Sequence, residues 1–156
     1  MIEILLIGIG SGNPDHLTLE AIKALRTAEI ILIPLKGADK SDLADVRRQM
    51  VAEFATKPET RVVEFQMPRR NVEHPDYLAG VEKWHANIAA AWRQEIANHA
   101  GSSGRVALLV WGDPSLYDST LRITARLSEQ LPVTVRVVPG ITSLQALTAA
   151  HRTPLN

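Results

Sequence analysis

The chain contains no cysteine, which excludes disulfide bonds and metal sites built on thiolates. It has no excess of charge either, because 17 Lys and Arg balance 17 Asp and Glu. Proteins that bind nucleic acid usually carry a basic excess, so the composition argues against that class. No apolar run approaches the roughly 18 residues of a membrane span. Neither nucleic acid nor a membrane is therefore expected as a partner. A cytoplasmic location is expected, with which the absence of cysteine is compatible.

Short runs of Ile, Val and Leu predict strands at 2–7, 30–34, 62–65, 106–110 and 133–138. Segments with helical periodicity lie between them, at 18–27, 41–54, 76–98 and 115–130, and a shorter helix follows Thr142. The first apolar run includes Glu3 and lacks a basic leader, so it is expected to be a strand rather than a signal peptide. This alternation predicts an α/β fold, with a mostly parallel five-stranded sheet and helices on both faces.

The periodicity also predicts which faces of the helices are buried. For 41–54 the apolar face is Leu43, Val46, Met50 and Phe54, and for 76–98 it is Leu78, Val81, Trp84, Ile88 and Trp92. His85 lies beside the second of these stripes and is interpreted as a structural residue. The histidines of the chain show no metal-ligand spacing, so no metal site is expected.

The stretch "GIGSGNPDHLT", residues 8–18, follows the first predicted strand. A dinucleotide-binding fingerprint needs a third glycine where this chain has Asn13, and an acidic residue at the end of the second strand, which ends in "ILIPLKG". The Walker pattern of phosphate-binding loops is absent as well. Taken alone, the stretch is explained equally well as a glycine-rich turn without a ligand.

Two further loops follow the fourth and fifth predicted strands, with the sequences "VWGDPSLYDS" and "VVPGITS". Each has a local explanation, since Asp113 suits a helix cap with Pro114 in the first turn, and Thr142 suits the cap of the last helix. The carboxyl ends of parallel strands, however, meet at one edge of a sheet, where ligands bind. Three glycine-containing loops at that edge favour a ligand site over three independent turns.

These three motifs, in this order, resemble those of the tetrapyrrole methylases, which use S-adenosylmethionine. The resemblance covers the whole chain and implies two α/β domains with the cofactor between them. Residues 1–153 are then expected to form the amino-terminal domain, and 154–156 to begin a linker to a second domain. The segment "KGADKSDLADVRR", 36–48, favours the members that methylate C1 of precorrin-5 and release its acetyl group as acetate. The alternatives are a methylase acting at another ring carbon and an inactive binding domain.

The resemblance also implies roles for individual residues. The expected cofactor contacts are Ser11, Trp111, Gly112, Asp113, Leu116, Thr142 and Ser143. Glycine at 112 suits a cofactor that approaches the backbone closely, and Asp113 suits either the cofactor's ammonium group or a helix cap. The substrate carboxylates are expected near Lys36, Lys40, Arg69 and Arg70. For the deacetylation step Asp113, Tyr117, Asp118 and the second domain all stay open as sources of the catalytic group. Relatives are usually homodimers.

Overall fold

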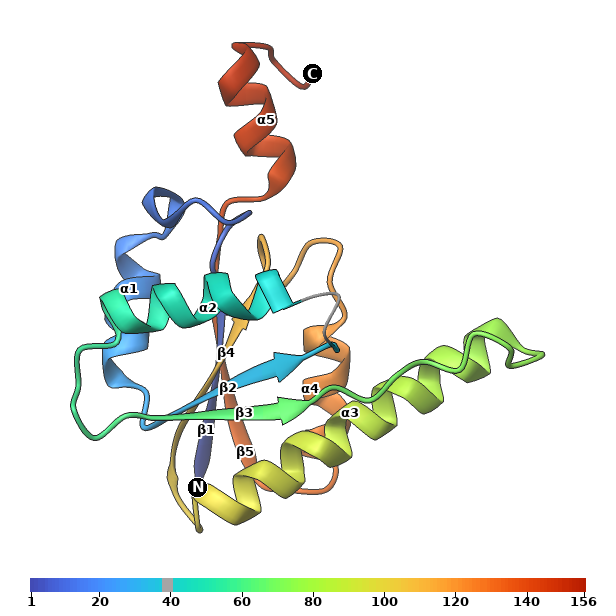
Figure 1. Cartoon of the computed structure of the whole chain (residues 1–156). Coiled ribbons are helices and arrows are strands. Elements are labelled where there is room, and N and C mark those ends of the chain that lie inside the picture. The colour runs from blue at the N-terminus through green and yellow to red at the C-terminus, as the bar shows by residue number, and fades with distance from the viewer. Residues whose placement is uncertain (38–40) are drawn as a thin grey trace.

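The computed structural model describes residues 1–37 and 41–156, so Lys40 lies outside the described residues. Its elements alternate along the chain (Figure 1). They are β1 (Ile2–Gly8), a 3-10 turn (Pro14–His16), α1 (Leu19–Thr27), β2 (Ile30–Leu35), α2 (Ser41–Phe54), β3 (Arg61–Gln66), α3 (Tyr77–His99), β4 (Gly104–Val110), α4 (Thr120–Ser128), β5 (Val133–Val138) and α5 (Ser143–His151). The predicted strands and most of the predicted helices are confirmed to within a few residues.

The five strands form one parallel sheet in the order β3-β2-β4-β1-β5. β1 and β4 lie side by side at its centre, where Ile4 pairs with Val106. The chain leaves β1 across β4 towards β2, whereas it leaves β4 in the opposite direction towards β5. Neighbouring strands whose connections diverge in this way form the switch point at which α/β sheets bind ligands. The fold therefore places the loops after β1 and β4 at such a point.

Helices cover both faces of the sheet, as the sequence predicts (Figure 1). Because side chains alternate along a strand, Leu5 and Ile7 of β1 pack with α1 and α2 on one face. Ile4 and Leu6 pack with α3 and α4 on the other face. The helix α5 stands away from this layered body (Figure 1). No helix within the described ranges has both the length and the apolar character needed to cross a membrane.

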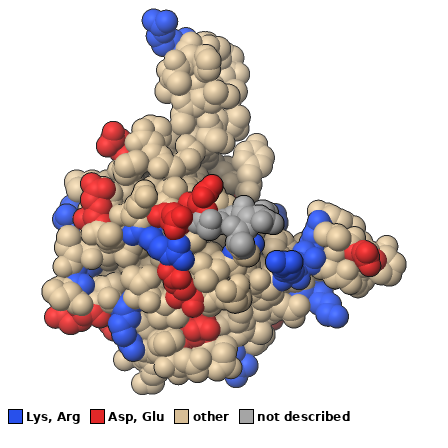
Figure 2. Space-filling model, viewed as in Figure 1, with Lys and Arg blue, Asp and Glu red and all other residues tan. Residues whose placement is uncertain are grey.

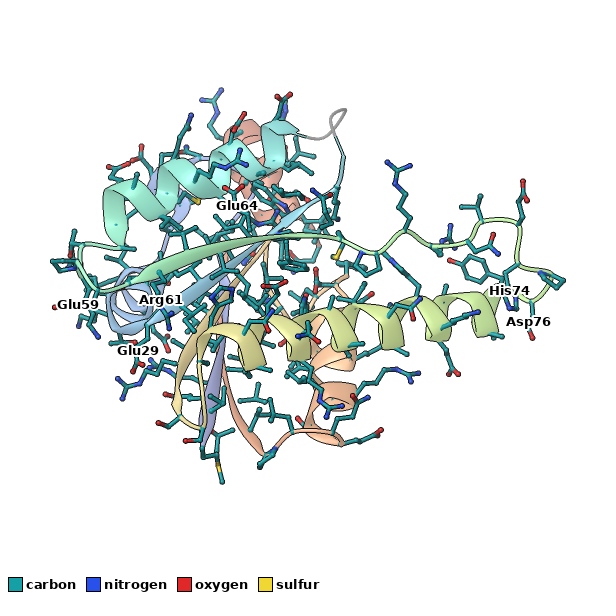
Figure 3. The ribbon with its side chains drawn as sticks, turned by 60° about the horizontal axis from the view of Figure 1, so that its bottom comes forward. Glu29, Glu59, Arg61, Glu64, His74 and Asp76 are labelled. Carbon is teal, nitrogen blue, oxygen red and sulfur yellow. The ribbon has the colours of Figure 1, made fainter. Side chains whose placement is uncertain are left out.

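The buried face of α2 differs from the predicted one by about one position. Ala44, Arg47, Met50 and Val51 are buried, whereas Leu43 is 38% exposed. Ala44 is small, so turning it inwards allows α2 to lie close to the sheet. The neighbouring Arg48 stays outside and donates from Nε and Nη2 to both carboxylate oxygens of Glu64 on β3, at 2.6 and 2.9 Å (Figure 3). This exposed ion pair links the outer side of α2 to β3.

The amino-terminal part of α3 extends beyond the sheet (Figure 1), and this changes one prediction about the core. Ile88, Trp92 and Ile96 are buried, but Leu78 is 73% exposed because its turn of the helix has no sheet beneath it. The Asp76 side chain caps the projecting end by accepting from the Ala79 N–H at 3.1 Å (Figure 3). The carboxyl-terminal part of α3 therefore belongs to the core, and its amino-terminal part projects from the body of the molecule.

The buried His85 of α3 gives the fold a predictable response to acid. Burial lowers the pKa of His85, Arg126 and Arg122 lower it further, and Glu82 acts in the opposite direction. An unfolded chain has the ordinary histidine pKa of about 6.5 and binds more protons there than the folded chain. The contribution of His85 to stability is therefore present above that pH and is lost as the pH falls below it.

Replacing His85 by glutamine should flatten the decrease in unfolding free energy between about pH 7 and pH 5, because the variant no longer takes up this proton on unfolding. Urea denaturation at a series of pH values measures the slope. His151→Gln is the control, since His151 is exposed at the end of α5. Equal slopes in the two variants would contradict the assignment.

Candidate functional site

The loops after β1 and β4 are joined by a short antiparallel bridge. The Gly112 N–H donates to the Gly10 carbonyl at 2.8 Å, and the Gly10 N–H donates back to the Gly112 carbonyl at 3.4 Å. The loop after β5 packs against both, because Gly8 and Gly140 bring the backbones together. A Cβ on Gly140 would lie 2.1 Å from the Gly112 oxygen and 2.9 Å from the Gly8 Cα. The predicted meeting of three glycine loops is thus confirmed, and glycine is required for it.

Asp113 does not cap a helix, which corrects one of the two interpretations of this residue. Asp113 is 8% exposed, and its carboxylate accepts from the Ser115 N–H at 2.7 Å and from the Gly140 N–H at 2.9 Å. The helix predicted at 115–130 begins only at Thr120, because Tyr117 has a φ of +56° that a right-handed helix does not allow. Asp113 therefore fastens the loop after β4 to the loop after β5.

Asp113→Asn should lower the free energy of unfolding by about 2 kcal/mol, since one charge-assisted hydrogen bond is lost and an amide N–H faces a backbone N–H. Urea denaturation measures the change. Asp76→Asn is the matched control, because Asp76 makes one capping bond at the end of α3 and asparagine caps equally well. A loss no larger than that of the control would contradict the fastening role.

The three loops enclose a cavity of about 190 Å³. Its lining residues are Gly10, Ser11, Trp111, Gly112, Leu116, Tyr117, Thr142, Ser143 and Leu144. We call this cavity the cradle. It brings together six of the seven residues that the resemblance implies as cofactor contacts, and leaves out Asp113. Gly112 has a φ of +63°, so glycine suits both the backbone conformation and the open wall.

The Thr142 side chain is engaged within the chain. Its hydroxyl accepts from the Gln145 N–H at 3.4 Å, and the Gln145 side chain accepts from the Thr142 N–H at 2.8 Å. This capping box confirms the predicted start of α5 at Thr142. It fixes the first turn of α5, with Ser143 and Leu144, as one wall of the cradle.

A second cavity, of about 210 Å³, lies beside the cradle between the carboxyl ends of β2 and β4 and the helices α3 and α4. We call it the side cavity. Trp111 and Tyr117 line both spaces, so the two adjoin. Asp118 lines the side cavity, and its carboxylate accepts from the Thr120 N–H at 2.6 Å.

Arg47 also lines the side cavity, although the sequence did not predict it as a site residue. It is 6% exposed, its Nε donates to the Leu109 carbonyl at 3.1 Å, and its guanidinium lies 4.9 Å from the Trp111 ring centre. Burial lowers the pKa of Arg47 to about 10, with the charge of Asp118 opposing the shift. The signal was present in the sequence, because Arg47 lies four residues after Leu43 and three before Met50, on the apolar stripe.

The predicted substrate-binding residues also lie together. Lys36, Arg69 and Arg70 line a groove of about 410 Å³ with Met67 and Trp84. Lys36 lines the side cavity as well, which places the groove next to it. Figure 2 shows basic side chains where the projecting segment leaves the body of the molecule. The groove thus combines positive charge with an apolar floor.

A family profile described as Tetrapyrrole (Corrin/Porphyrin) Methylases matches residues 3–156. The chain belongs to the tetrapyrrole methylases. Over 158 residues this methylase is 50% identical to precorrin-6A synthase (deacetylating) of Sinorhizobium sp, and the match covers 100% of this chain and 60% of that relative. The chain therefore spans about 60% of the length of this curated relative.

Two solved structures extend the comparison. A cobalamin synthesis related protein from Corynebacterium diphtheriae is 41% identical with a TM-score of 0.78, over 100% of this chain and 60% of that one. Uroporphyrin-III C-methyltransferase from Thermus thermophilus, solved with S-adenosylhomocysteine, is 23% identical with a TM-score of 0.58, over 93% of this chain and 47% of that one. The likeness to the Thermus thermophilus enzyme shows that the two proteins share a fold.

Proposed function

We propose that this methylase chain is the amino-terminal domain of an S-adenosylmethionine-dependent C-methyltransferase of cobalamin biosynthesis. The reaction proposed is methylation of C1 of precorrin-5 with loss of the acetyl group as acetate, giving precorrin-6A. The observation that carries the proposal is the 50% identity to precorrin-6A synthase over the whole chain. The cradle at the switch point of the sheet supports it, because it supplies a binding site where an α/β fold is expected to have one.

The cradle fits the cofactor on physical grounds. Its wall at Gly112 is bare backbone, and the first turn of α5 stands opposite, with Thr142 Cα 3.7 Å from the position of a Cβ on Gly112. Ser11, Trp111, Gly112, Leu116, Thr142 and Ser143 would hold the cofactor, while Asp113 keeps the loops in place. When bound, S-adenosylmethionine supplies an electrophilic methyl group. The protein's part is alignment, which supplies several kcal/mol of barrier reduction.

The basic groove is proposed to hold the carboxylates of the tetrapyrrole. Arg69 and Arg70 offer planar donor pairs that suit carboxylates, and Lys36 adds a charge between the groove and the side cavity. The Arg70 guanidinium lies 5.1 Å from the Tyr77 ring centre, which holds the side chain over the projecting end of α3. Met67 and Trp84 provide an apolar surface for the macrocycle itself.

Residues 1–153 are proposed to form the first domain, with 154–156 leading to a second domain that covers α5. Two observations support this arrangement. The chain spans 60% of the length of its relative, and the exposed apolar side chains Leu144, Leu147 and Leu155 gather on or just after α5. The left-handed Arg152, with a φ of +53°, ends α5 before Pro154 and turns the chain away from the helix.

The function is tested with the complete natural polypeptide, precorrin-5 and S-adenosylmethionine labelled with carbon-13 in the methyl group. The expected result is a product methylated at C1 and an equal amount of free acetate. A label on another ring carbon would favour the alternative of a different methylase. Binding of S-adenosylhomocysteine with no product of either kind would favour an inactive binding domain.

A further inference from the structure

We propose that Arg47 and Asp118 remove the acetyl group, with Arg47 binding the acetyl carbonyl oxygen and Asp118 accepting the proton of the attacking water. Both residues line the side cavity. This proposal rests on the proposed function, because it assigns residues of this chain to one half of that reaction.

The size and lining of the side cavity suit a small acyl group. The cavity has a volume of about 210 Å³. A water molecule in the liquid takes up about 30 Å³, so the cavity holds an acetyl group together with a water molecule. It is too small for the macrocycle. Phe65, Ile88 and Leu108 give part of the wall an apolar character that suits the acetyl methyl group. Trp111 and Tyr117 line both this space and the cradle, so a carbon held where the two spaces adjoin is within reach of both.

Arg47 is built as a fixed, buried cation. The Nε bond to Leu109 and the stacking on Trp111 hold the guanidinium plane in place. Within the described part of the chain its terminal nitrogens have no hydrogen-bond acceptor, and the buried Trp111 N–H also lacks one. Its pKa of about 10 keeps it charged at neutral pH. A preorganised donor in a buried site stabilises a developing oxyanion far more than a donor in water does.

Of the three candidates for the deacetylation base, Asp113, Tyr117 and Asp118, only Asp118 has a fixed carboxylate with an oxygen left for water. Asp113 uses both carboxylate oxygens for the Ser115 and Gly140 N–H groups. Tyr117 is 93% exposed, and no group in the described chain fixes its hydroxyl. Asp118 has one oxygen fixed by the Thr120 N–H, which orients the carboxylate and leaves its other oxygen for a water molecule. This is the arrangement expected of a general base.

The step balances as follows. The water oxygen bonds to the acyl carbon, its proton passes to Asp118, and the carbonyl electron pair moves to the oxygen held by Arg47. When the carbonyl re-forms, the bond between C1 and the acyl carbon breaks and acetic acid leaves with the water's oxygen. The electron pair stays on C1, which forms its new bond to the methyl group while the methyl–sulfur pair returns to sulfur. Asp118 then releases its proton to solvent.

The test uses the complete polypeptide and two substrates, precorrin-5 and the same compound lacking the acetyl group. With precorrin-5, Asp118→Asn and Arg47→Gln should each reduce acetate release and methyl transfer about 100-fold. With the compound lacking the acetyl group, both variants should transfer methyl at the wild-type rate. The affinity of Asp118→Asn for S-adenosylhomocysteine, measured by calorimetry, should also be unchanged.

The controls are Asp45→Asn and Arg48→Gln, which alter an exposed ion pair on the outer side of α2. Arg47→Lys provides a second variant that keeps the charge if Arg47→Gln does not fold, and it should show the same contrast between the two substrates. Acetate release at the wild-type rate from the Asp118 variant, or equal losses on both substrates, would overturn the proposal. If the wild-type protein yields neither acetate nor methylated product, the proposed function itself fails.

Discussion

Gly140→Ala should lower the free energy of unfolding by about 3 kcal/mol or more, the largest loss expected for a single methyl group in this chain. The new Cβ would lie 2.1 Å from the Gly112 carbonyl oxygen and 2.9 Å from the Gly8 Cα. Both contacts are with backbone, which no change of rotamer relieves. The three loops would have to separate, and the bond from the Gly140 N–H to Asp113 would be lost with them. Urea denaturation followed by circular dichroism measures the loss.

Gly101→Ala is the control for this substitution. A Cβ on Gly101 meets nothing within 4 Å, so the variant has only the strain of its φ of +64°, about 1 kcal/mol. If the two variants lose the same stability, the close packing of the loops contributes nothing and the description of the glycine contact is wrong.

Gly112→Ala should weaken binding of S-adenosylhomocysteine by about 100-fold or more, which corresponds to about 2.7 kcal/mol. A Cβ on Gly112 would lie 3.7 Å from the Thr142 Cα, so the methyl group fits in the absence of ligand. It would then stand between the two walls of the cradle, where the cofactor is proposed to lie. Calorimetric titration of the complete polypeptide measures the affinity.

The same Gly101→Ala variant serves as a matched control for strain. The φ values of Gly112 and Gly101 are +63° and +64°, so alanine costs a similar backbone energy at both sites. We therefore expect similar losses of stability and very different losses of affinity. Unchanged affinity in Gly112→Ala would refute the placement of the cofactor against this backbone.

The sequence predicts the elements of this fold well because most of the signals are local. The run that begins at Val106 is apolar throughout, and the run that begins at Ile2 is apolar except for Glu3, as expected for strands covered on both faces, and each forms a strand. Strand order is not a local property, since it depends on which crossovers pack together. It had to come from the structure, which places β4 between β2 and β1.

The loop after β4 shows why the candidate site could be predicted only in part. Asp113 and Pro114 give the usual signal for a helix start, but the carboxylate bonds to Gly140, which is distant in the sequence. The helix begins later, at Thr120, where the Asp118 carboxylate accepts from the Thr120 N–H. A local rule cannot place the helix start correctly when a long-range bond engages the expected cap.

Arg47 is the opposite case. The sequence places this arginine on the apolar stripe of a helix, but it does not reveal that the charge is buried. An arginine on an apolar helical stripe is normally explained by its long aliphatic stem, with the charge reaching water. Here the guanidinium is buried, because it donates a hydrogen bond to the Leu109 carbonyl and lies over the Trp111 ring. Both partners come from β4 and its loop, so only the assembled sheet reveals the buried cation.

The interior position of β1 in the sheet has a consequence for synthesis of the protein on the ribosome. Ile2 pairs with Gly104 on one side and Val133 on the other, so β1 emerges long before either of its partner strands. At a translation rate of about 5–20 residues per second, that delay is roughly 5 to 20 seconds. During this time "IEILLIG" is an unpaired apolar segment of the kind that chaperones bind and that drives aggregation. A strand that is shielded on both edges in the finished domain is thus among the most vulnerable segments of the nascent chain.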